Sequence, residues 1–133
     1  METDPAHPDP TRAAEAGLVA LSDELTTPRP QECLFCFVDR MLTAFGCDNT
    51  LRWVRRWREL RRPRAAGLEG RLGRSGAFCD CEVFLNGWTV RDDLLVPDAH
   101  GEGDWPPRRP DCAGTGPRSS QPCATWVRRQ RDW

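Results

Sequence analysis

Two pairs of cysteines have a spacing that places two thiols on the same face of the chain. Cys33 and Cys36 are three residues apart and share a face if they lie on a helix. Cys79 and Cys81 are two residues apart and share a face if they lie on a strand. Two such pairs supply the four thiolates of a tetrahedral zinc site, and Cys47, at the start of a predicted helix, can replace one of them. These five cysteines are therefore candidate metal ligands.

The same cysteines admit two other interpretations. They can be buried free thiols that act as small hydrophobic residues of a core. Alternatively, Cys33 and Cys36 can form a redox pair, because a C-x-x-C in the first turn of a helix gains thiolate stability from the helix dipole. The buried strand that precedes this motif in thioredoxin-like folds is not visible in the sequence. Cys112 and Cys123 lie in a Pro- and Gly-rich tail, and we expect them to be bystanders.

Basic residues gather in one short segment. The net charge of −1 hides a strong asymmetry, since residues 51–64 carry seven arginines and one glutamate, whereas residues 1–31 are acidic. Clustered arginine attracts a phosphate backbone, and Trp53 near the same face is predicted to stack on a base. The alternative is a solvated face that acidic neighbours neutralise. The candidate nucleic-acid or partner-binding residues are Arg52, Arg55, Arg56 and Arg62.

Three acidic residues, Asp48, Asp80 and Glu82, stand beside the candidate thiols. Paired carboxylates can act as a general acid and base or can hold a hard metal ion. Asp48 has a simpler role as a helix N-cap, and Glu82 can pair with a helix arginine. The two histidines, His7 and His100, lie outside the predicted core, so the sequence does not identify an enzyme.

The composition confines the core to the middle of the chain. The 133 residues leave room for one domain, and their hydrophobic fraction of 38% is low. Residues 1–31 are predicted to be partly helical or disordered, and the Pro-, Gly- and Arg-rich residues 97–133 are predicted to have little fixed structure. Residues 32–96 are the predicted folded domain. A core of this size often depends on a metal ion, a disulfide or a partner.

The sequence also predicts where the protein resides. No stretch approaches the roughly 18 apolar residues of a membrane span. The acidic N-terminus lacks the basic start and apolar run of a secretory signal. We therefore expect a cytoplasmic protein, in which seven cysteines indicate reduced thiols, a metal site or a redox site rather than a disulfide scaffold.

Hydrophobic periodicity predicts helices followed by a β-hairpin. Residues 79–85 alternate between apolar and acidic side chains, as in a strand with one buried face. Asn86-Gly87 is a strong hairpin signal, and residues 88–90 are the predicted returning strand. The expected fold is a small α+β domain of two or three helices packed on a short β-hairpin, with disordered tails. Helices are predicted over residues 11–26, 32–45, 48–61 and 64–73.

Two sequence segments resemble the signature of a bacterial family, domain-of-unknown-function family 2695. They run from Cys47 to Arg52 and from Gly76 to Val83, and the resemblance covers about residues 33–88. Many members have His where this chain has Asn49, so a ligand supplied by that His would be lost here. The resemblance implies a compact domain of helices and strands and implies no activity. The signature residues are Cys47, Asp48, Thr50, Cys79, Asp80, Cys81 and Glu82.

Together these features predict a non-catalytic binding or interaction module. Its cysteine cluster is expected to hold a structural zinc ion, and its partner is expected to be a protein or a nucleic acid, with no membrane involved. The alternative, from a different functional class, is a small thiol-based redox protein or sensor. Nucleic-acid binding through the arginine-rich helix is a further alternative.

Overall fold

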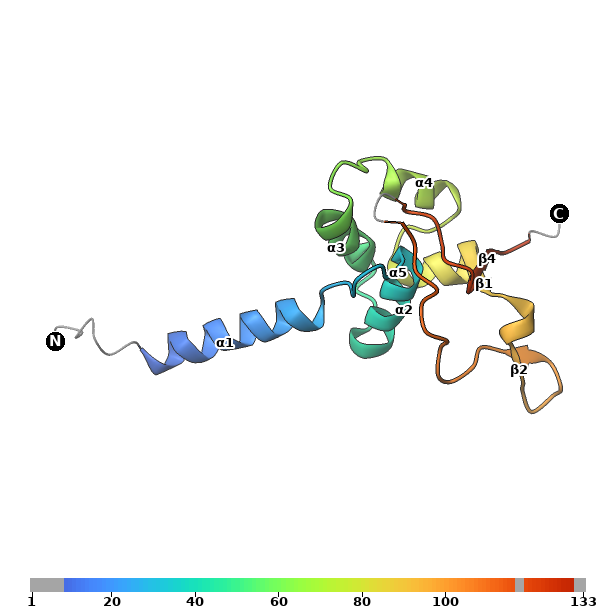
Figure 1. Ribbon diagram of the computed structural model, residues 1–133, viewed down its shortest axis with the longest axis horizontal. Coiled ribbons are helices and arrows are strands. Elements are labelled where there is room, and N and C mark those ends of the chain that lie inside the picture. Colours follow the sequence, from blue (N-terminus) through green and yellow to red (C-terminus); the bar gives the residue numbers. More distant parts are fainter. Residues whose placement is uncertain (1–8, 117–118, 131–133) are drawn as a thin grey trace.

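The computed structural model describes residues 9–116 and 119–130 (Figure 1). Residues 1–8, which include His7 and the start of the segment predicted to be partly helical or disordered, lie outside the described residues, as do 117–118 and 131–133. None of the helices in the described part of the chain has the length and hydropathy of a membrane-spanning segment.

Helices make up most of the ordered structure, and two small sheets complete it. One antiparallel sheet pairs β1 with β4 and the other pairs β2 with β3. The expectation of a small α+β domain is therefore confirmed. The helices are α1 (Pro10–Leu25), α2 (Leu34–Phe45), α3 (Arg52–Arg61), α4 (Leu68–Arg74) and the one-turn α5 (Asp80–Glu82). The strands are β1 (Trp88–Val90), β2 (Val96–Pro97), β3 (Gly103–Asp104) and β4 (Trp126–Arg128).

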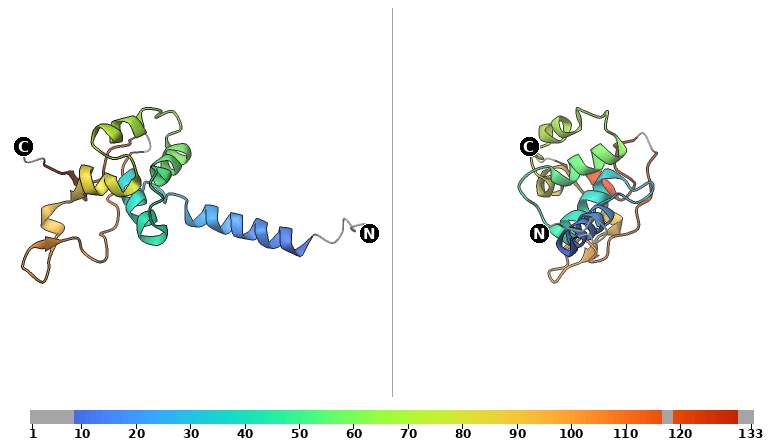
Figure 2. Two further views of the ribbon diagram at one scale, coloured as in Figure 1. Left: turned by 180° about the vertical axis from the view of Figure 1, so that it is seen from behind. Right: turned by 90° about the vertical axis from the view of Figure 1, so that its left-hand side faces the viewer.

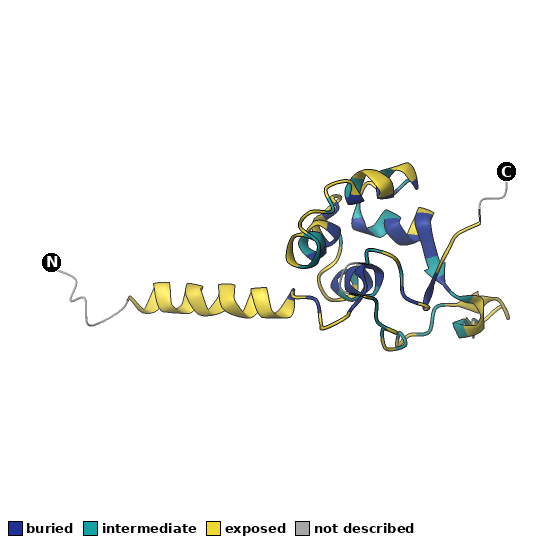
Figure 3. Ribbon diagram, turned by 45° about the horizontal axis from the view of Figure 1, so that its top comes forward, coloured by how far each residue is buried: buried dark blue, intermediate teal, exposed yellow. Residues whose placement is uncertain are grey.

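Helix α1 projects from the rest of the molecule (Figures 1 and 2). It begins at Asp9, whose carboxylate accepts a hydrogen bond from the backbone N–H of Thr11, with Pro10 in the first turn. No residue of α1 is buried, and Figure 3 shows the helix exposed along its length. The large apolar side chains of this helix are therefore open to solvent, with Leu18 66% exposed.

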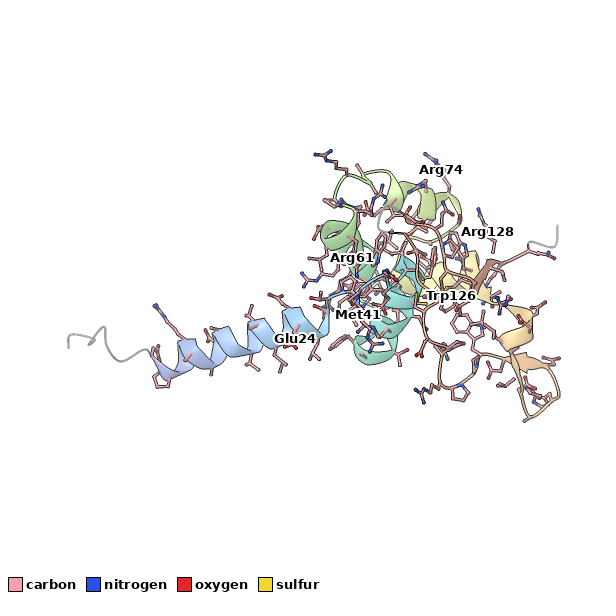
Figure 4. All side chains as sticks on the ribbon, in the orientation of Figure 1. Glu24, Met41, Arg61, Arg74, Trp126 and Arg128 are labelled. Atoms are coloured by element: carbon pink, nitrogen blue, oxygen red, sulfur yellow. The ribbon has the colours of Figure 1, made fainter. Side chains whose placement is uncertain are left out.

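Helices α2 and α3 pack against each other and form the centre of the core. Val38 and Met41 of α2 are buried at helical spacing, and Figure 4 shows Met41 on the helix face that looks into the domain. Two indoles of α3 anchor it to the ends of α2: Trp57 Nε1 donates to the carbonyl of Glu32, and Trp53 Nε1 donates to the carbonyl of Gly46. Gly46, with a φ of 81°, ends α2 as its type predicts.

The predicted strand over residues 79–85 is wrong. The chain there forms α5 and then a π-helical turn, Val83–Gly87, that leads into β1. Asp80, Val83 and Phe84 are buried, whereas Leu85, expected in the core, is 68% exposed. The three buried residues have the three- and four-residue spacing of a helix. The hydrophobicity pattern does not reveal this spacing, because the first buried position is an aspartate and such a pattern assigns aspartate to the surface.

The return strand of the predicted hairpin exists, but its partner comes from the far end of the chain. Antiparallel pairing joins β1 to β4, with Thr89 opposite Val127. Trp126 at the start of β4 is 3% exposed and packs on the ring of Phe84 (Figure 4). The described residues of the C-terminal segment thus add to the core, which differs from the expectation of little fixed structure there.

One buried carboxylate connects α5 to α3. Asp80 is fully buried, and its two side-chain oxygens accept hydrogen bonds from the backbone N–H groups of Trp53 (2.9 Å) and Val54 (3.1 Å). These groups belong to the first turn of α3, which has no side-chain cap of its own. Asp48, the predicted cap, instead accepts from the backbone N–H of Thr50.

Replacing Asp80 by alanine should therefore destabilise the domain. The substitution leaves two buried N–H groups without acceptors, and we expect it to lower the free energy of unfolding by about 2 kcal/mol or more. Asp80→Asn keeps one acceptor and should cost less. Urea unfolding at fixed metal concentration measures both. Asp93→Ala, at an exposed surface ion pair, is the control and should change stability little. Equal stability of Asp80→Ala and the parent would contradict the assignment.

Candidate metal centre

Four cysteines from two parts of the chain meet at one point beside α2. Cys33 precedes α2, Cys36 lies in its first turn, and Cys112 and Cys123 come from the C-terminal segment. Their four sulfur atoms all lie within 4.8 Å of one another. Cys33 and Cys123 are buried, and the other two are half-buried. Four thiols this close together could hold a metal ion.

The separation of the sulfur atoms matches metal ligation better than disulfide bonding. The Sγ atoms of Cys36 and Cys123 are 3.6 Å apart. In a tetrahedral zinc–thiolate site with Zn–S bonds of about 2.3 Å, neighbouring sulfurs are about 3.8 Å apart. A disulfide brings them to about 2.05 Å. All seven cysteines of the chain are free thiols.

The sulfur atoms of the cluster accept hydrogen bonds from N–H groups around them. The backbone N–H of Cys36 donates to Cys33 Sγ, and those of Cys33 and Gly114 donate to Cys112 Sγ, each at 3.3 Å. The indole N–H of Trp126 donates to Cys36 Sγ, also at 3.3 Å. A thiol is a weak acceptor and a thiolate is a strong one. These N–H donors would also stabilise thiolate sulfurs, and the thiolate is the form that binds metals.

Three thiols of the cluster, those of Cys33, Cys36 and Cys123, share their protons unequally. Hydrogen bonds from the thiols of Cys33 and Cys36 lower the pKa of Cys123. The same contact with Cys123 raises the pKa of Cys33 to about 12 and also raises that of Cys36. The groups therefore titrate as a set, in which one thiolate is held by its protonated neighbours. A divalent cation replaces those protons as the partner of the thiolates.

The other three cysteines form a second, separate group. Cys47 lies in the loop after α2, Cys79 lies just before α5, and Cys81 lies within α5. Burial raises the pKa of Cys47, but hydrogen bonds from the backbone N–H groups of Cys81 and Asn49, and from the thiols of Cys81 and Cys79, outweigh it, so the pKa is lowered. Burial, followed by the contact with Cys47, raises the pKa of Cys81 to about 11.

The five predicted ligands are thus divided between two places. The two predicted pairs are present, because Cys33 lies beside Cys36, and Cys79 and Cys81 both lie near Cys47. The two pairs, however, are not in contact with each other. Cys33 and Cys36 join Cys112 and Cys123, which sequence reasoning set aside. One signal was present: a glycine two residues after Cys112. Gly114, with a φ of 82°, directs its N–H back to that sulfur.

A cavity of about 690 Å³ borders the four-cysteine cluster. Cys36, Cys112 and Trp126 line one part of it. Two ion pairs line the rest: Arg40 contacts Glu32 at 2.8 Å, and Arg109 contacts Asp39 at 3.2 Å. Burial raises the pKa of Asp39, and Arg109 opposes this shift. The cavity therefore presents both signs of charge next to the thiols.

The arginines of α3 are only partly available to a partner. Arg52 and Arg55 are exposed, and Arg62 is half-buried. Arg56 donates to the carbonyl of Thr26 and lies 3.7 Å from Asp23, so the C-terminal end of α1 neutralises part of the face. Trp53, predicted to stack on a base, is 2% exposed and lies beneath the guanidinium of Arg52. The indole is therefore not available for stacking.

The acidic residues of the signature have structural partners. Asp80 caps α3, and Asp48 holds the turn that ends at Thr50. Glu82 accepts a hydrogen bond from the backbone N–H of Phe78 at 3.2 Å and fixes the turn that carries Cys79. Through these contacts the three acidic side chains hold the backbone around the second cysteine group.

The fold and its two cysteine groups define a small α+β domain organised around thiols. The sequence profile of a family described as "Protein of unknown function (DUF2695)" matches residues 34–86. The chain belongs to this bacterial family. Uncharacterized proteins of Mycobacterium bovis and Mycobacterium tuberculosis are each 36% identical to it over 69 residues, which are 51% of this chain and 70% of each relative. No solved structure matches the chain.

The family segment includes one cysteine group and leaves out most of the other. Cys47, Cys79 and Cys81 all lie within residues 34–86. Of the four-cysteine cluster only Cys36 does, since Cys112 and Cys123 lie well beyond the segment. The two groups are therefore distinct in sequence as well as in space.

The lowered pKa of Cys47 should show in its rate of alkylation. In chelator-treated protein at pH 7, iodoacetamide should modify Cys47 faster than Cys81, because more of Cys47 is thiolate at that pH. The rate at Cys47 should also level off at a lower pH than the rate at Cys81. Peptide mass spectrometry gives both rates, with circular dichroism to verify the fold. Cys81 is the matched control because both side chains are half-buried. Equal rates across the pH range would contradict the assignment.

Proposed function

We propose that this protein is a non-catalytic binding module whose C-terminal segment is fastened to the helical core by a structural zinc ion. The observation that carries this proposal is the convergence of four thiols from two distant segments within 4.8 Å. Four thiolates fill the tetrahedral coordination of zinc and leave no position for a substrate, which is the pattern of structural sites. The ligands are Cys33, Cys36, Cys112 and Cys123.

The fold gives the zinc ion a clear structural task. Cys36 and Cys123 are 87 residues apart, so closing this loop costs chain entropy. Strand β4, which follows Cys123, has three residues, too few to hold the segment by pairing alone. Yet the segment brings Trp126 onto Phe84 and covers the core. A metal–thiolate link supplies binding free energy that this small core otherwise lacks.

The cavity beside the centre is the proposed binding surface. Its volume of about 690 Å³ suits a short peptide segment or a side chain of a partner. Its lining carries both charges in equal number, which favours a protein partner over a polyanion. The charged lining residues are Arg29, Glu32, Asp39, Arg40, Arg109 and Asp111. Because thiolate ligands need a reducing compartment, we place the protein in the cytoplasm.

Zinc loading of the full chain tests the proposed centre. Zinc should protect the half-buried Cys36 and Cys112 from N-ethylmaleimide, and a chelator should remove that protection. Cys123→Ser removes one ligand and should abolish the protection of both. Cys47→Ser lies outside the centre and is the control, so it should leave the protection intact. Peptide mass spectrometry reads the modification at each cysteine.

Two outcomes would overturn this proposal. The first is that Cys36 and Cys112 react at the same rate with and without zinc in the folded parent protein. The second is that the protein gains no zinc and instead loses two hydrogens reversibly on treatment with a peroxide, with a disulfide between Cys36 and Cys123. That result would favour the alternative of a thiol-based redox protein or sensor.

Nucleic-acid binding through α3 is a second candidate function, and it depends on the two exposed arginines, Arg52 and Arg55. If it holds, Arg52→Glu with Arg55→Glu should weaken binding to a DNA duplex by about tenfold or more, and the affinity of the parent should fall steeply with salt. Fluorescence anisotropy measures both. Arg64→Glu with Arg74→Glu, which makes the same charge change at exposed sites elsewhere, is the control. An equal loss in both double variants would exclude a specific site on α3.

A further inference from the structure

Helix α1 is the longest helix in the described part of the chain, yet none of its 16 residues is buried (Figure 3). Its ion pair with α3 lies in its last turn, where Arg56 is 3.7 Å from the carboxylate of Asp23. A helix of this length that packs on nothing is only marginally stable in water. The exposed turns of α1 therefore need a packing partner.

The apolar side chains of α1 form one stripe, which we call the leucine stripe. It consists of Ala14, Leu18, Leu21 and Leu25. Their separations of four, three and four residues are those of the a and d positions of a coiled-coil heptad. The three leucines are each half exposed or more. A contiguous apolar face on a projecting helix marks an interaction surface.

We infer that α1 is a dimerisation helix, whose leucine stripe packs antiparallel on the leucine stripe of a second copy of this chain. The inference goes beyond the proposed function and does not require the zinc ion. In such a pair the a positions of one helix face the d positions of the other. Leu18 then lies opposite Leu21 of the second copy, and Leu25 lies opposite Ala14. The two central layers hold leucine on both sides, and the two outer layers fit a large side chain against a small one.

Packing and charge both favour the antiparallel direction over the parallel one. A parallel pair would place Ala14 opposite Ala14 and would leave a gap in that layer. It would also bring the acidic last turns, with Asp23 and Glu24, side by side. The antiparallel pair separates these acids and sets the two helix dipoles in opposite directions. The contact surface is the same on both copies, so the assembly closes at two chains.

A hollow beside the last turn of α1 offers charges that match this arrangement. It has a volume of about 330 Å³, and Ser22 and Thr26 form the part of its wall that belongs to the end of α1. Three exposed side chains of α3 also line it: Arg52, Arg55 and Glu59. Two guanidinium groups and one carboxylate are therefore open to a charged partner at this end of α1.

Glu15 is the acid that the antiparallel pair brings to this hollow. It precedes Ser22 by seven residues and Thr26 by eleven, so the three share one side of the helical chain. In an antiparallel pair, equivalent sides of the two helices meet along the same edge of the contact. The second turn of one α1 also lies level with the last turn of the other. The carboxylate of Glu15 therefore meets Arg52 and Arg55 of the second copy.

A further pair of opposite charges follows from the same register. Arg12 precedes Glu15 by three residues, so it lies on the same side of α1 and one turn closer to the domain of the second copy. Helix α3 runs in that direction too, since Arg61 at its end donates to the carbonyl of Arg29. Glu59 is therefore the residue of the hollow that Arg12 meets. Each half of the dimer thus sets an acid against two arginines and an arginine against an acid.

The mass of the full chain as a function of concentration tests the dimer. Sedimentation equilibrium under reducing conditions should show a reversible monomer–dimer equilibrium for the parent. Leu18→Glu with Leu21→Glu should raise the dimer dissociation constant by about tenfold or more, because it places charge in both central layers. The matched control, Ala13→Glu with Ala20→Glu, adds the same charge on the opposite, exposed face of α1 and should leave the constant unchanged. Since no residue of α1 is buried, circular dichroism should show an intact domain in both variants.

Charge reversal tests the register separately. Glu15→Arg should raise the dissociation constant by about threefold or more, and so should Arg52→Glu with Arg55→Glu. The triple variant that combines these changes exchanges the signs across the contact and should return the constant towards the parent value. A change on α1 cannot repair a purely structural defect in α3, so this rescue is specific for the contact.

Four results would overturn the inference. The first is a parent protein that stays monomeric at its highest soluble concentration. The second is an equal loss of affinity in the leucine variant and its control. The third is a triple variant that dissociates as readily as Glu15→Arg, which excludes the antiparallel register. The fourth is a dimer that a chelator dissociates, because metal rather than α1 would then join the copies. A dimer that persists in chelator supports the inference whether or not the zinc centre exists.

Discussion

The hydrogen bonds from the first turn of α3 to the buried carboxylate of Asp80 are the constraint on which the rest of the domain depends. They satisfy two backbone donors that no side chain of α3 itself reaches. They also fix the turn at α5 against the loop after α2. The packing of α3 and the position of the second cysteine group therefore both depend on the side chain of Asp80. A buried carboxylate is costly unless it is fully paired, and here the helix dipole and two N–H donors supply the pairing.

The four-cysteine cluster lies where the Pro-rich C-terminal segment, which has few apolar residues, packs on the core. Strand β4 and Trp126 cover the end of the domain, but three paired residues provide little stability alone. Thiols from the start of α2 and from this segment meet beside Trp126, whose indole N–H donates to one of the sulfurs. Apolar burial and the four thiols therefore meet at the same point of this segment.

Local patterns predicted the local parts of this structure. The helical periodicity of α2 and its stop at Gly46 follow from neighbouring residues, and so does the pairing of Cys33 with Cys36. What failed depended on distant contacts. The strand predicted at residues 79–85 is helical because Asp80 occupies a core position that only α3 can satisfy. Cys112 and Cys123 were set aside because their contact with α2 spans a long stretch of sequence, and because Gly114, the one local signal, lies in a segment that is rich in glycine throughout.

The two cysteine groups differ in the number of thiols and in their burial. In the four-cysteine cluster two cysteines are buried and two are half-buried, so a metal ion bound there would take every ligand from the protein and would act on folding. The three cysteines of the second group are all half-buried. The family segment contains this second group, whereas the four-cysteine cluster depends on the C-terminal segment beyond it. The four-cysteine cluster is therefore a feature that joins the C-terminal segment of this chain to the domain that the family segment forms.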